Sequence, residues 1–177
     1  GPVVVSLDSF VRYHAEQSWT WERMALTRAR VIAGPPALAQ SLEAAIRQAL
    51  TRGDAANVIA DARDMRRRLA EQFPGANSWD LKFTPGGLID LEFIAQALQL
   101  VHAEARPEIL DTNTIGALEK LGAAGLLPEA PTLTAAAALE QALTQLLRIA
   151  IDGSLEESAA SPGLKSLLAR AGAAPGF

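Results

Sequence analysis

The stretch L-I-D-L-E-F-I-A-Q-A-L-Q-L-V-H-A, residues 88–103, decides the fold. Apolar side chains fall on almost every side of a helix with this sequence. They leave one narrow polar stripe, formed by Glu92, Gln96 and Gln99. A helix that is apolar nearly all round is surrounded by other elements of its domain. We therefore expect residues 88–103 to form the central helix of a helical domain.

Proline and glycine divide the rest of the chain into segments whose apolar residues recur at spacings of three, four and seven, which is typical of amphipathic helices. We expect further helices over about 7–17, 20–33, 37–52, 55–72, 113–125, 132–152 and 161–172. The stretch 73–87 has no helical period, and residues 79–83 within it fit a short extended segment. Because most connections are short, the predicted class is an all-α, mainly antiparallel bundle of about seven to eight helices, with residues 1–177 forming a single domain.

Composition agrees with helices and excludes several kinds of site. Alanine (35) and leucine (25) make up about a third of the 177 residues, whereas aromatic residues make up 5%. The absence of cysteine excludes disulfides and thiolate metal ligands, and two histidines are too few for a zinc site. A net charge of −4 gives no general attraction to nucleic acid. With no long apolar run and no basic leader, we expect a cytoplasmic protein with no nucleic-acid or membrane partner.

The segment W-T-W-E-R-M-A-L-T-R-A-R, residues 19–30, carries several charges. If it is one continuous helix, at roughly 100° per residue, Arg28 lies on the same apolar face as Trp21. Arg23 and Arg30 lie on the opposite face, and Glu22 lies near alanines. A guanidinium on an apolar face needs a carboxylate or phosphate partner. The sequence leaves two interpretations open: a buried ion pair inside the bundle, or the wall of a cleft.

The central helix carries two carboxylates, Asp90 and Glu92, which lie roughly 200° apart around its axis. At this angle they cannot bind one metal ion together, so each needs its own cation. Arg28, together with Arg23 or Arg30, supplies candidate partners, and the spacing does not assign the pairs.

Lys82, Gly86 and Gly87 precede the central helix. Two glycines at a helix N-terminus permit close approach of an anion or of another backbone segment, and the free amides there favour negative charge. A plain turn is the simpler interpretation. Near it in the chain, the arginines at 63, 66, 67 and 68 are interpreted as a solvated helix face, with a basic patch for an acidic partner as the alternative.

Two stretches resemble a known family. These are S-x-x-x-F…Y…W-T-W-E-R-x-A-L-T-R-A-R-V, from Ser6 to Val31, and D-L-K-F-T-P-G-G-L-I-D-L-E-F-I, residues 80–94. N-T-I-x-A-L at 113–118 and A-G-L-L at 124–127 agree in order and spacing. Over about residues 2–150 the chain resembles the helical domain of bacterial glutamine synthetase adenylyltransferase. It resembles the C-terminal, adenylylating half of that enzyme more than the deadenylylating half.

This resemblance implies an enzyme of nitrogen control that uses ATP and Mg²⁺ to transfer AMP to a tyrosine of glutamine synthetase. Its second half removes the AMP by phosphorolysis, and PII signal proteins and glutamine set the balance. The family's nucleotidyltransferase domain carries a G-S…D-x-D signature that holds the metal, and this sequence lacks it. We therefore expect no catalytic residue, metal ligand or cofactor in this chain, and no activity from it alone.

The resemblance also implies where the charged residues point. By matching positions, the residues facing the nucleotidyltransferase domain are Glu22, Arg23, Arg28, Arg30, Lys82, Gly86, Gly87, Asp90 and Glu92. The cations would meet phosphates or acidic groups, the glycines would allow close approach, and the two carboxylates of the central helix would hold the cations in position. The implied partners are glutamine synthetase, the PII signal protein and the chain's own nucleotidyltransferase domain.

Three alternatives remain. The chain is a PII-binding interaction module with no part in an active site, or the equivalent domain of PII uridylyltransferase, or a helical bundle whose charges are only structural.

Overall fold

The computed structural model describes residues 4–173, and within that range it contains eight α-helices and two 3₁₀ helices. They are α1 (Leu7–Glu16), α2 (Thr20–Leu26), α3 (Pro36–Leu50), α4 (Ala55–Gln72), α5 (Leu88–His102), η1 (Pro107–Ile109), α6 (Thr114–Ala123), α7 (Ala130–Ala150), η2 (Glu157–Ala159) and α8 (Pro162–Ala173). The predicted all-α class and number of helices are confirmed. None of these helices combines the length and apolar character needed to cross a bilayer.

Polar side chains cap the N-termini of three helices, close to the predicted starts of these helices. Ser6 accepts a hydrogen bond from the amide of Ser9 at the start of α1, and Asn113 accepts one from Gly116 at the start of α6. Ser161 does the same for Leu164 ahead of the proline that opens α8. Such caps satisfy amides that have no partner within the helix.

Helix α5 is central, as predicted, because α2, α4, α6 and α7 all pack against it. On one side, its Ala97 and Leu100 meet Met24 of α2 and Val58 of α4 in an apolar cluster. On the other side, Leu91 and Ala95 belong to a second cluster, which contains Ala117 and Leu118 of α6 and Ala137 of α7. The two cores therefore share one helix, which fixes the elements on either side of it.

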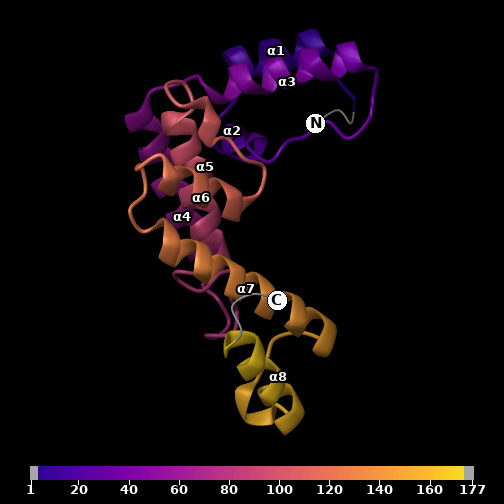
Figure 1. Ribbon diagram of the computed structural model, residues 1–177, viewed down its shortest axis with the longest axis vertical. Helices are drawn as coiled ribbons and strands as arrows, with labels where there is room; N and C mark the ends of the chain where they lie inside the picture. The colour runs from indigo at the N-terminus through magenta and orange to yellow at the C-terminus, as the bar shows by residue number, and fades with distance from the viewer. Residues whose placement is uncertain (1–3, 174–177) are drawn as a thin grey trace.

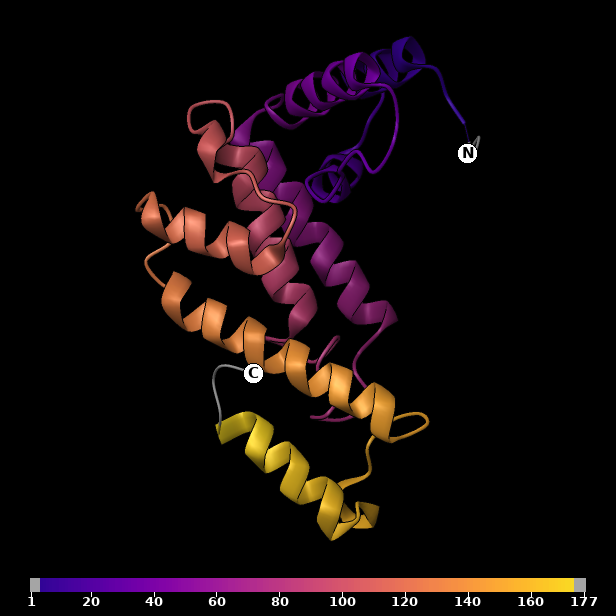
Figure 2. The same ribbon diagram turned by 45° about the vertical axis from the view of Figure 1, so that its right-hand side comes forward.

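The molecule is elongated, with α5 near its middle (Figure 1). At one end α1 and α3 lie side by side as an arm above α2, and at the other end α8 packs on α7 (Figures 1 and 2). No residue of α1 is buried. Within the arm, α1 is thus only partly covered, whereas α3 buries Ala45, Ala49 and Leu50.

Two local predictions are wrong. Helix α2 ends at Leu26 rather than near residue 33, because the amides of Arg28 and Ala29 bond to carbonyls only three residues earlier and the Thr27 hydroxyl donates to the Met24 carbonyl. Residues 79–83 form turns instead of an extended segment. The amides of Phe83 and Thr84 both donate to the Asp80 carbonyl, which folds the segment back on itself.

Candidate functional site

The charged residues of α2 begin with Glu22, whose carboxylate closes the start of its own helix. It accepts hydrogen bonds from the Trp19 amide at 2.9 Å and from the Tyr13 hydroxyl at 2.6 Å. The hydrogen bond to Glu22 raises the pKa of Tyr13. The first contact caps α2, and the second fixes the end of α1 against it. Glu22 is therefore engaged in holding two helices together.

Arg23 joins α2 to the connection between α3 and α4. Its guanidinium donates a hydrogen bond to the carbonyl of Arg52. The same guanidinium lies so close to Gly53 that a Cβ atom at position 53 would clash with it. Next to it, the Thr20 hydroxyl donates to Asp61 of α4. The expected pairing of Arg23 with a carboxylate of α5 does not occur, because these contacts hold it on the other side of α2.

Asp90 is held by Arg66 of α4 in a two-contact ion pair, whose second contact, Nη2 to Oδ2, measures 3.1 Å. Its Oδ2 also accepts the amide of Gly86 at 2.6 Å. Both side chains are largely covered, at 18% exposed for Arg66 and 26% for Asp90. The interpretation of the arginine run as a solvated face is therefore wrong for Arg66. It applies to Arg67 and Arg68, which are exposed and pair with Asp64 one turn away.

Arg28 pairs with Glu92 at 2.9 Å, as one of the sequence alternatives allowed. The pair is not buried, since 52% of the Arg28 side chain and 35% of the Glu92 side chain are exposed. The helical wheel misplaced Arg28 because α2 ends before it. The apolar face drawn around Trp21 is also wrong, since Trp21 is half-exposed and Met24 is the residue that enters the core.

The glycine pair before α5 forms a tight turn. Gly86 adopts a positive φ of 86°, and Gly87 lies so close to the carbonyls of Leu81 and Thr84 that a Cβ there would clash with both. The close approach expected of this pair is thus to the chain's own backbone.

No amide at this turn is free for an anion. Gly86 donates to Asp90, and Gly87 donates to Thr84. The first two amides of α5 donate to the carbonyls of Leu81 and Lys82. The amides of this helix N-terminus are thus satisfied within the chain, which agrees with the simpler interpretation of the two glycines as a plain turn. The Lys82 ammonium lies 4.8 Å from the ring centre of Phe83, and its side chain is exposed.

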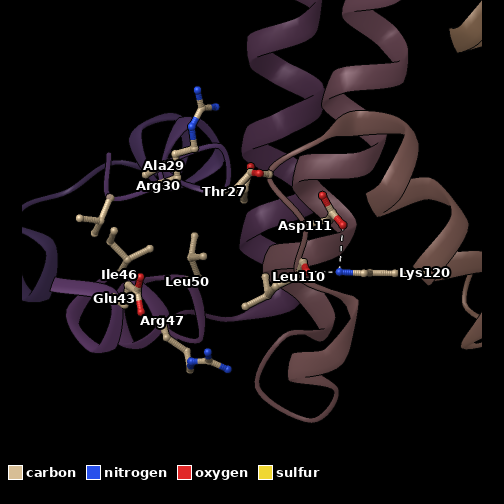
Figure 3. Close-up of a pocket in the computed structure, with 12 residues that line it drawn as sticks. Thr27, Ala29, Arg30, Glu43, Ile46, Arg47, Leu50, Leu110, Asp111 and Lys120 are labelled. Carbon is tan, nitrogen blue, oxygen red and sulfur yellow. Dashed lines mark hydrogen bonds and ion pairs between the residues drawn. The ribbon is translucent and has the colours of Figure 1, made fainter. Parts of the chain in front are cut away.

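Arg30 lies at the edge of a pocket of about 420 Å³ between α3, the segment after α2 and the start of α6. Ile46, Leu50 and Leu110 supply its apolar lining (Figure 3). The guanidinium of Arg30 points away from the middle of the pocket, and Arg47 does the same on the opposite rim (Figure 3). Both arginines are thus available to a group that approaches from outside.

Two further charged residues of this pocket, Lys120 and Asp111, are paired with each other. The Lys120 ammonium contacts Asp111 at 2.9 Å and the Leu110 carbonyl at 2.8 Å (Figure 3). Burial acts to raise the pKa of Asp111, but the Asn113 amide and Lys120 outweigh it, so the pKa is lowered. The pair joins η1 to α6 and leaves the pocket no free cation on that side.

A second hollow, of about 630 Å³, runs between α4 and α5 and is closed on one side by the corner between α6 and α7. Ile59, Phe93, Ile94, Leu98 and Leu133 give it an apolar lining, and the Arg66–Asp90 pair lies at its edge. Asp90 thus belongs to this hollow and Arg30 to the other one. These two charged residues, both expected to face the same domain, therefore line separate hollows.

Sequence reasoning named two residues without finding their structural roles. One is Arg66, which the run of arginines concealed. The other is Gln99, which is 2% exposed, donates to the Ala95 carbonyl and accepts the Asp111 amide at 2.8 Å. A glutamine on an otherwise apolar stretch of helix was the available signal, because a buried amide side chain needs partners.

The carboxylates do not fit a magnesium site. Asp90, Glu92 and Asp61 are already engaged by Arg66, Arg28 and Thr20, respectively. Between residues 4 and 173, no three potential metal ligands of the histidine, cysteine, aspartate or glutamate type come together.

Glu140 of α7 lies near Asp90 and has an unusual environment. Burial raises its pKa, and the negative charge of Asp90 raises it further. Its Oε2 atom is covered and has no hydrogen-bond partner among the described residues. The folded protein therefore binds a proton at Glu140 more tightly than the unfolded chain does.

We predict that Glu140→Gln stabilises the protein at neutral pH and not at acid pH. With a raised pKa in the folded state, the contribution of Glu140 is fully present below its unfolded pKa and is lost as the pH rises through the folded pKa. Thermal unfolding at pH 4 and pH 7 should give a higher midpoint for Glu140→Gln at pH 7 only. Glu119→Gln, at an exposed position of α6, is the matched control. An equal change at both pH values would contradict the prediction.

Two protein-family models match parts of this chain. Residues 1–45 match the model for glutamate-ammonia ligase adenylyltransferase, and residues 60–152, just over half of the chain, match the model for GlnD PII-uridylyltransferase. The first covers α1, α2 and the beginning of α3, and the second covers most of α4 to α7.

Curated relatives match the whole chain. Proteins named bifunctional glutamine synthetase adenylyltransferase/adenylyl-removing enzyme are 46% identical in Bradyrhizobium diazoefficiens and 45% identical in Rhodopseudomonas palustris and Xanthobacter autotrophicus. Each alignment covers 100% of this chain and 18% of the relative. The chain thus spans about a fifth of the length of the curated relatives it matches.

Proposed function

This chain belongs to the family described by the GlnD PII-uridylyltransferase model, and from this premise we propose that it is the helical domain of a bifunctional enzyme that adenylylates and deadenylylates glutamine synthetase. The observation that carries the proposal is the match of every part of the chain to enzymes of that name at 43–46% identity. The fragment supplies a wall of the cleft in which AMP is transferred and surfaces for regulatory partners. The catalytic carboxylates, ATP and Mg²⁺ belong to another part of the enzyme, which leaves the fragment inactive alone.

The structure divides the nine predicted residues by their availability. Glu22, Arg23, Gly86, Gly87 and Asp90 are engaged in contacts that hold the fold. Arg28, Arg30, Lys82 and Glu92 keep charged groups at the surface. We assign the cleft wall to the second group, because only these can reach a phosphate or a second domain without breaking the helical domain.

The test uses the longer enzyme that contains this chain, with Arg28→Ala or Lys82→Ala. We expect kcat/KM for AMP transfer from ATP to glutamine synthetase to fall at least tenfold, with an unchanged unfolding midpoint. A half-exposed ion pair contributes only about 0–1 kcal/mol to stability, so the loss would not come from unfolding. Lys165→Ala, at an exposed position of α8, is the matched control.

A second candidate function is a module that binds the PII signal protein and takes no part in the cleft. It is favoured by the match of residues 60–152 to a PII-uridylyltransferase family model. The same two variants decide between the candidates. Normal turnover combined with weaker binding of PII would support the module and overturn the cleft wall.

A further inference from the structure

The hollow of about 630 Å³ between α4 and α5 has the size and the lining of a ligand pocket. Pockets that bind small molecules are typically about 300–1,000 Å³ and mainly apolar, with a few polar groups that orient the ligand. The charged residues that line this hollow are Arg63, Arg66, Asp90 and Glu129, and the rest of its lining is apolar side chains and one glycine. None of the residues assigned above to the cleft wall lines it.

The hollow has a charged end and an apolar end. Helices α4 and α5 lie side by side and run in opposite directions (Figure 2). The Arg66–Asp90 pair joins the second half of α4 to the first turn of α5. Arg63 lies one turn before Arg66, and Ile59 one turn before Arg63, whereas Leu98 lies about two turns beyond Asp90. Because the helices are antiparallel, Ile59 and Leu98 share the apolar end.

The charged end carries an unbalanced positive charge. Asp90 is already neutralised by Arg66 and accepts the Gly86 amide. Arg63 is exposed and forms no ion pair with any residue between 4 and 173. A guanidinium binds a carboxylate through two parallel hydrogen bonds. Arg63 is thus free to bind an anion at this end of the hollow.

The free carboxylate of the lining lies away from the charged end. Glu129 immediately precedes α7, whereas Glu140, which lies near Asp90, is eleven positions further along that helix. At about 1.5 Å per residue, Glu129 is about 16 Å along the helix from the charged end. Glu140 has a covered carboxylate oxygen and does not belong to the lining.

The apolar part of the hollow suits a straight hydrocarbon chain. Between Asp90 and Leu98 the helix rises about 12 Å, and Phe93, Ile94 and Leu133 supply apolar walls along this length. An extended alkyl chain advances roughly 1.25 Å per carbon, since its single bonds are about 1.5 Å long. A chain of about eight to ten carbons therefore covers the hollow, and its affinity comes from the apolar surface that it buries.

We propose that this hollow binds a medium-chain aliphatic carboxylate. The carboxylate pairs with Arg63, and the chain lies between α4 and α5 with its end toward Ile59 and Leu98. The positive charge of Arg63 selects the carboxylate, because it repels a cationic head group and gains little from a neutral one. The site goes beyond the proposed function, which places no ligand in this hollow.

The test is photolabelling of the longer enzyme that contains this chain. The probe is decanoic acid that carries a diazirine near the end of its chain, and labelled peptides are identified by mass spectrometry. Unmodified decanoate, decylamine and decanol compete for labelling, each below the concentration at which it aggregates. Arg63→Gln removes the proposed partner of the carboxylate. Arg68→Gln is the matched control, because Arg68 is an exposed arginine of the same helix that does not line the hollow.

We expect labels on residues 59–62 or 94–98, at the apolar end. Decanoate should compete at concentrations at least roughly fivefold lower than decylamine or decanol, because only the carboxylate forms charged hydrogen bonds with a guanidinium. Arg63→Gln should weaken the competition by decanoate by about the same factor, and Arg68→Gln should leave it almost unchanged. Both variants should keep the unfolding midpoint of the natural protein, since both positions are exposed.

Four results would overturn the proposal. Labels confined to other segments would place the ligand elsewhere, and equal competition by the three compounds would mean that the head group is not recognised. Equal effects of Arg63→Gln and Arg68→Gln would reduce the attraction to the general charge of α4. Absence of labelling in the intact enzyme would mean that another part of the protein covers the hollow.

The outcome is independent of the proposed function. Photolabelling reports only where the carboxylate binds, whereas AMP transfer is assayed separately on the same enzyme preparation. Labelling of the hollow in an enzyme without transferase activity would leave the binding site standing and remove the proposed reaction. Transferase activity without labelling would do the reverse.

Discussion

Gly87→Ala should lower the free energy of unfolding by about 1–3 kcal/mol, the range found when atoms are forced into a filled site. A Cβ atom at this position would clash with the Leu81 carbonyl and lie 2.9 Å from the Thr84 carbonyl. Both neighbours are backbone atoms, so no side-chain rotation can relieve the contact. Both carbonyls also accept hydrogen bonds, from Leu88 and from Gly87 itself, which any displacement would weaken.

The measurement for Gly87→Ala is urea unfolding followed by circular dichroism. Gly163→Ala is the control, because Gly163 lies in α8 and the only neighbour of a Cβ there is Ser161, at an ordinary 3.9 Å. Alanine is favoured over glycine inside a helix, so the control should be neutral or slightly stabilising. Equal stability of Gly87→Ala and the natural protein would mean that the turn before α5 can move.

The fold could be predicted from sequence where the signal lies within one element. Residues 88–103 are apolar on almost all sides whatever surrounds them, so the central position of α5 followed directly. The caps at Ser6, Asn113 and Ser161 are also local, since each oxygen bonds to an amide three residues later. Neither feature depends on which helices meet.

The end of α2 could not be predicted by the same means. The apolar spacing continues past Leu26 in T-R-A-R-V-I, and nothing in it resembles a strong helix stop. The helix ends where backbone amides bond to carbonyls three residues earlier and where the Thr27 hydroxyl donates a hydrogen bond to a backbone carbonyl. The chain then turns toward α3. The positions of Arg28 and Arg30 depend on that turn, so a helical wheel could not place them.

The partner of Asp90 depends on how two helices pack. Arg66 lies 24 residues before it, across a loop with no periodic pattern, and the sequence offered three other arginines close to Arg66. Arg66 reaches Asp90 because its side of α4 faces α5, whereas Arg67 and Arg68 face solvent. The charge pattern predicted that α5 carboxylates need cations, and only the packing decides which cation each receives.

The Arg66–Asp90 pair should therefore be coupled, and the Arg28–Glu92 pair should not. We expect Asp90→Ala and Arg66→Ala each to reduce the free energy of unfolding by about 2 kcal/mol, because each leaves a largely covered charge without its partner. Asp90→Ala also removes the acceptor of the Gly86 amide in the first turn of α5. The doubly substituted protein should lose less than the sum, with a coupling energy of about 1 kcal/mol or more.

The matched cycle uses Arg28→Ala and Glu92→Ala, whose pair lies on the same central helix but is far more exposed. Solvent screens that pair, so its coupling energy should stay below about 0.5 kcal/mol. Urea unfolding of the natural protein and the six variants gives both values under one condition. Additive effects at Arg66 and Asp90 would show that the two side chains are only neighbours. They would also remove the reason for assigning Asp90 to the fold and Arg28 to the cleft, because that assignment depends on the burial of one pair and the exposure of the other.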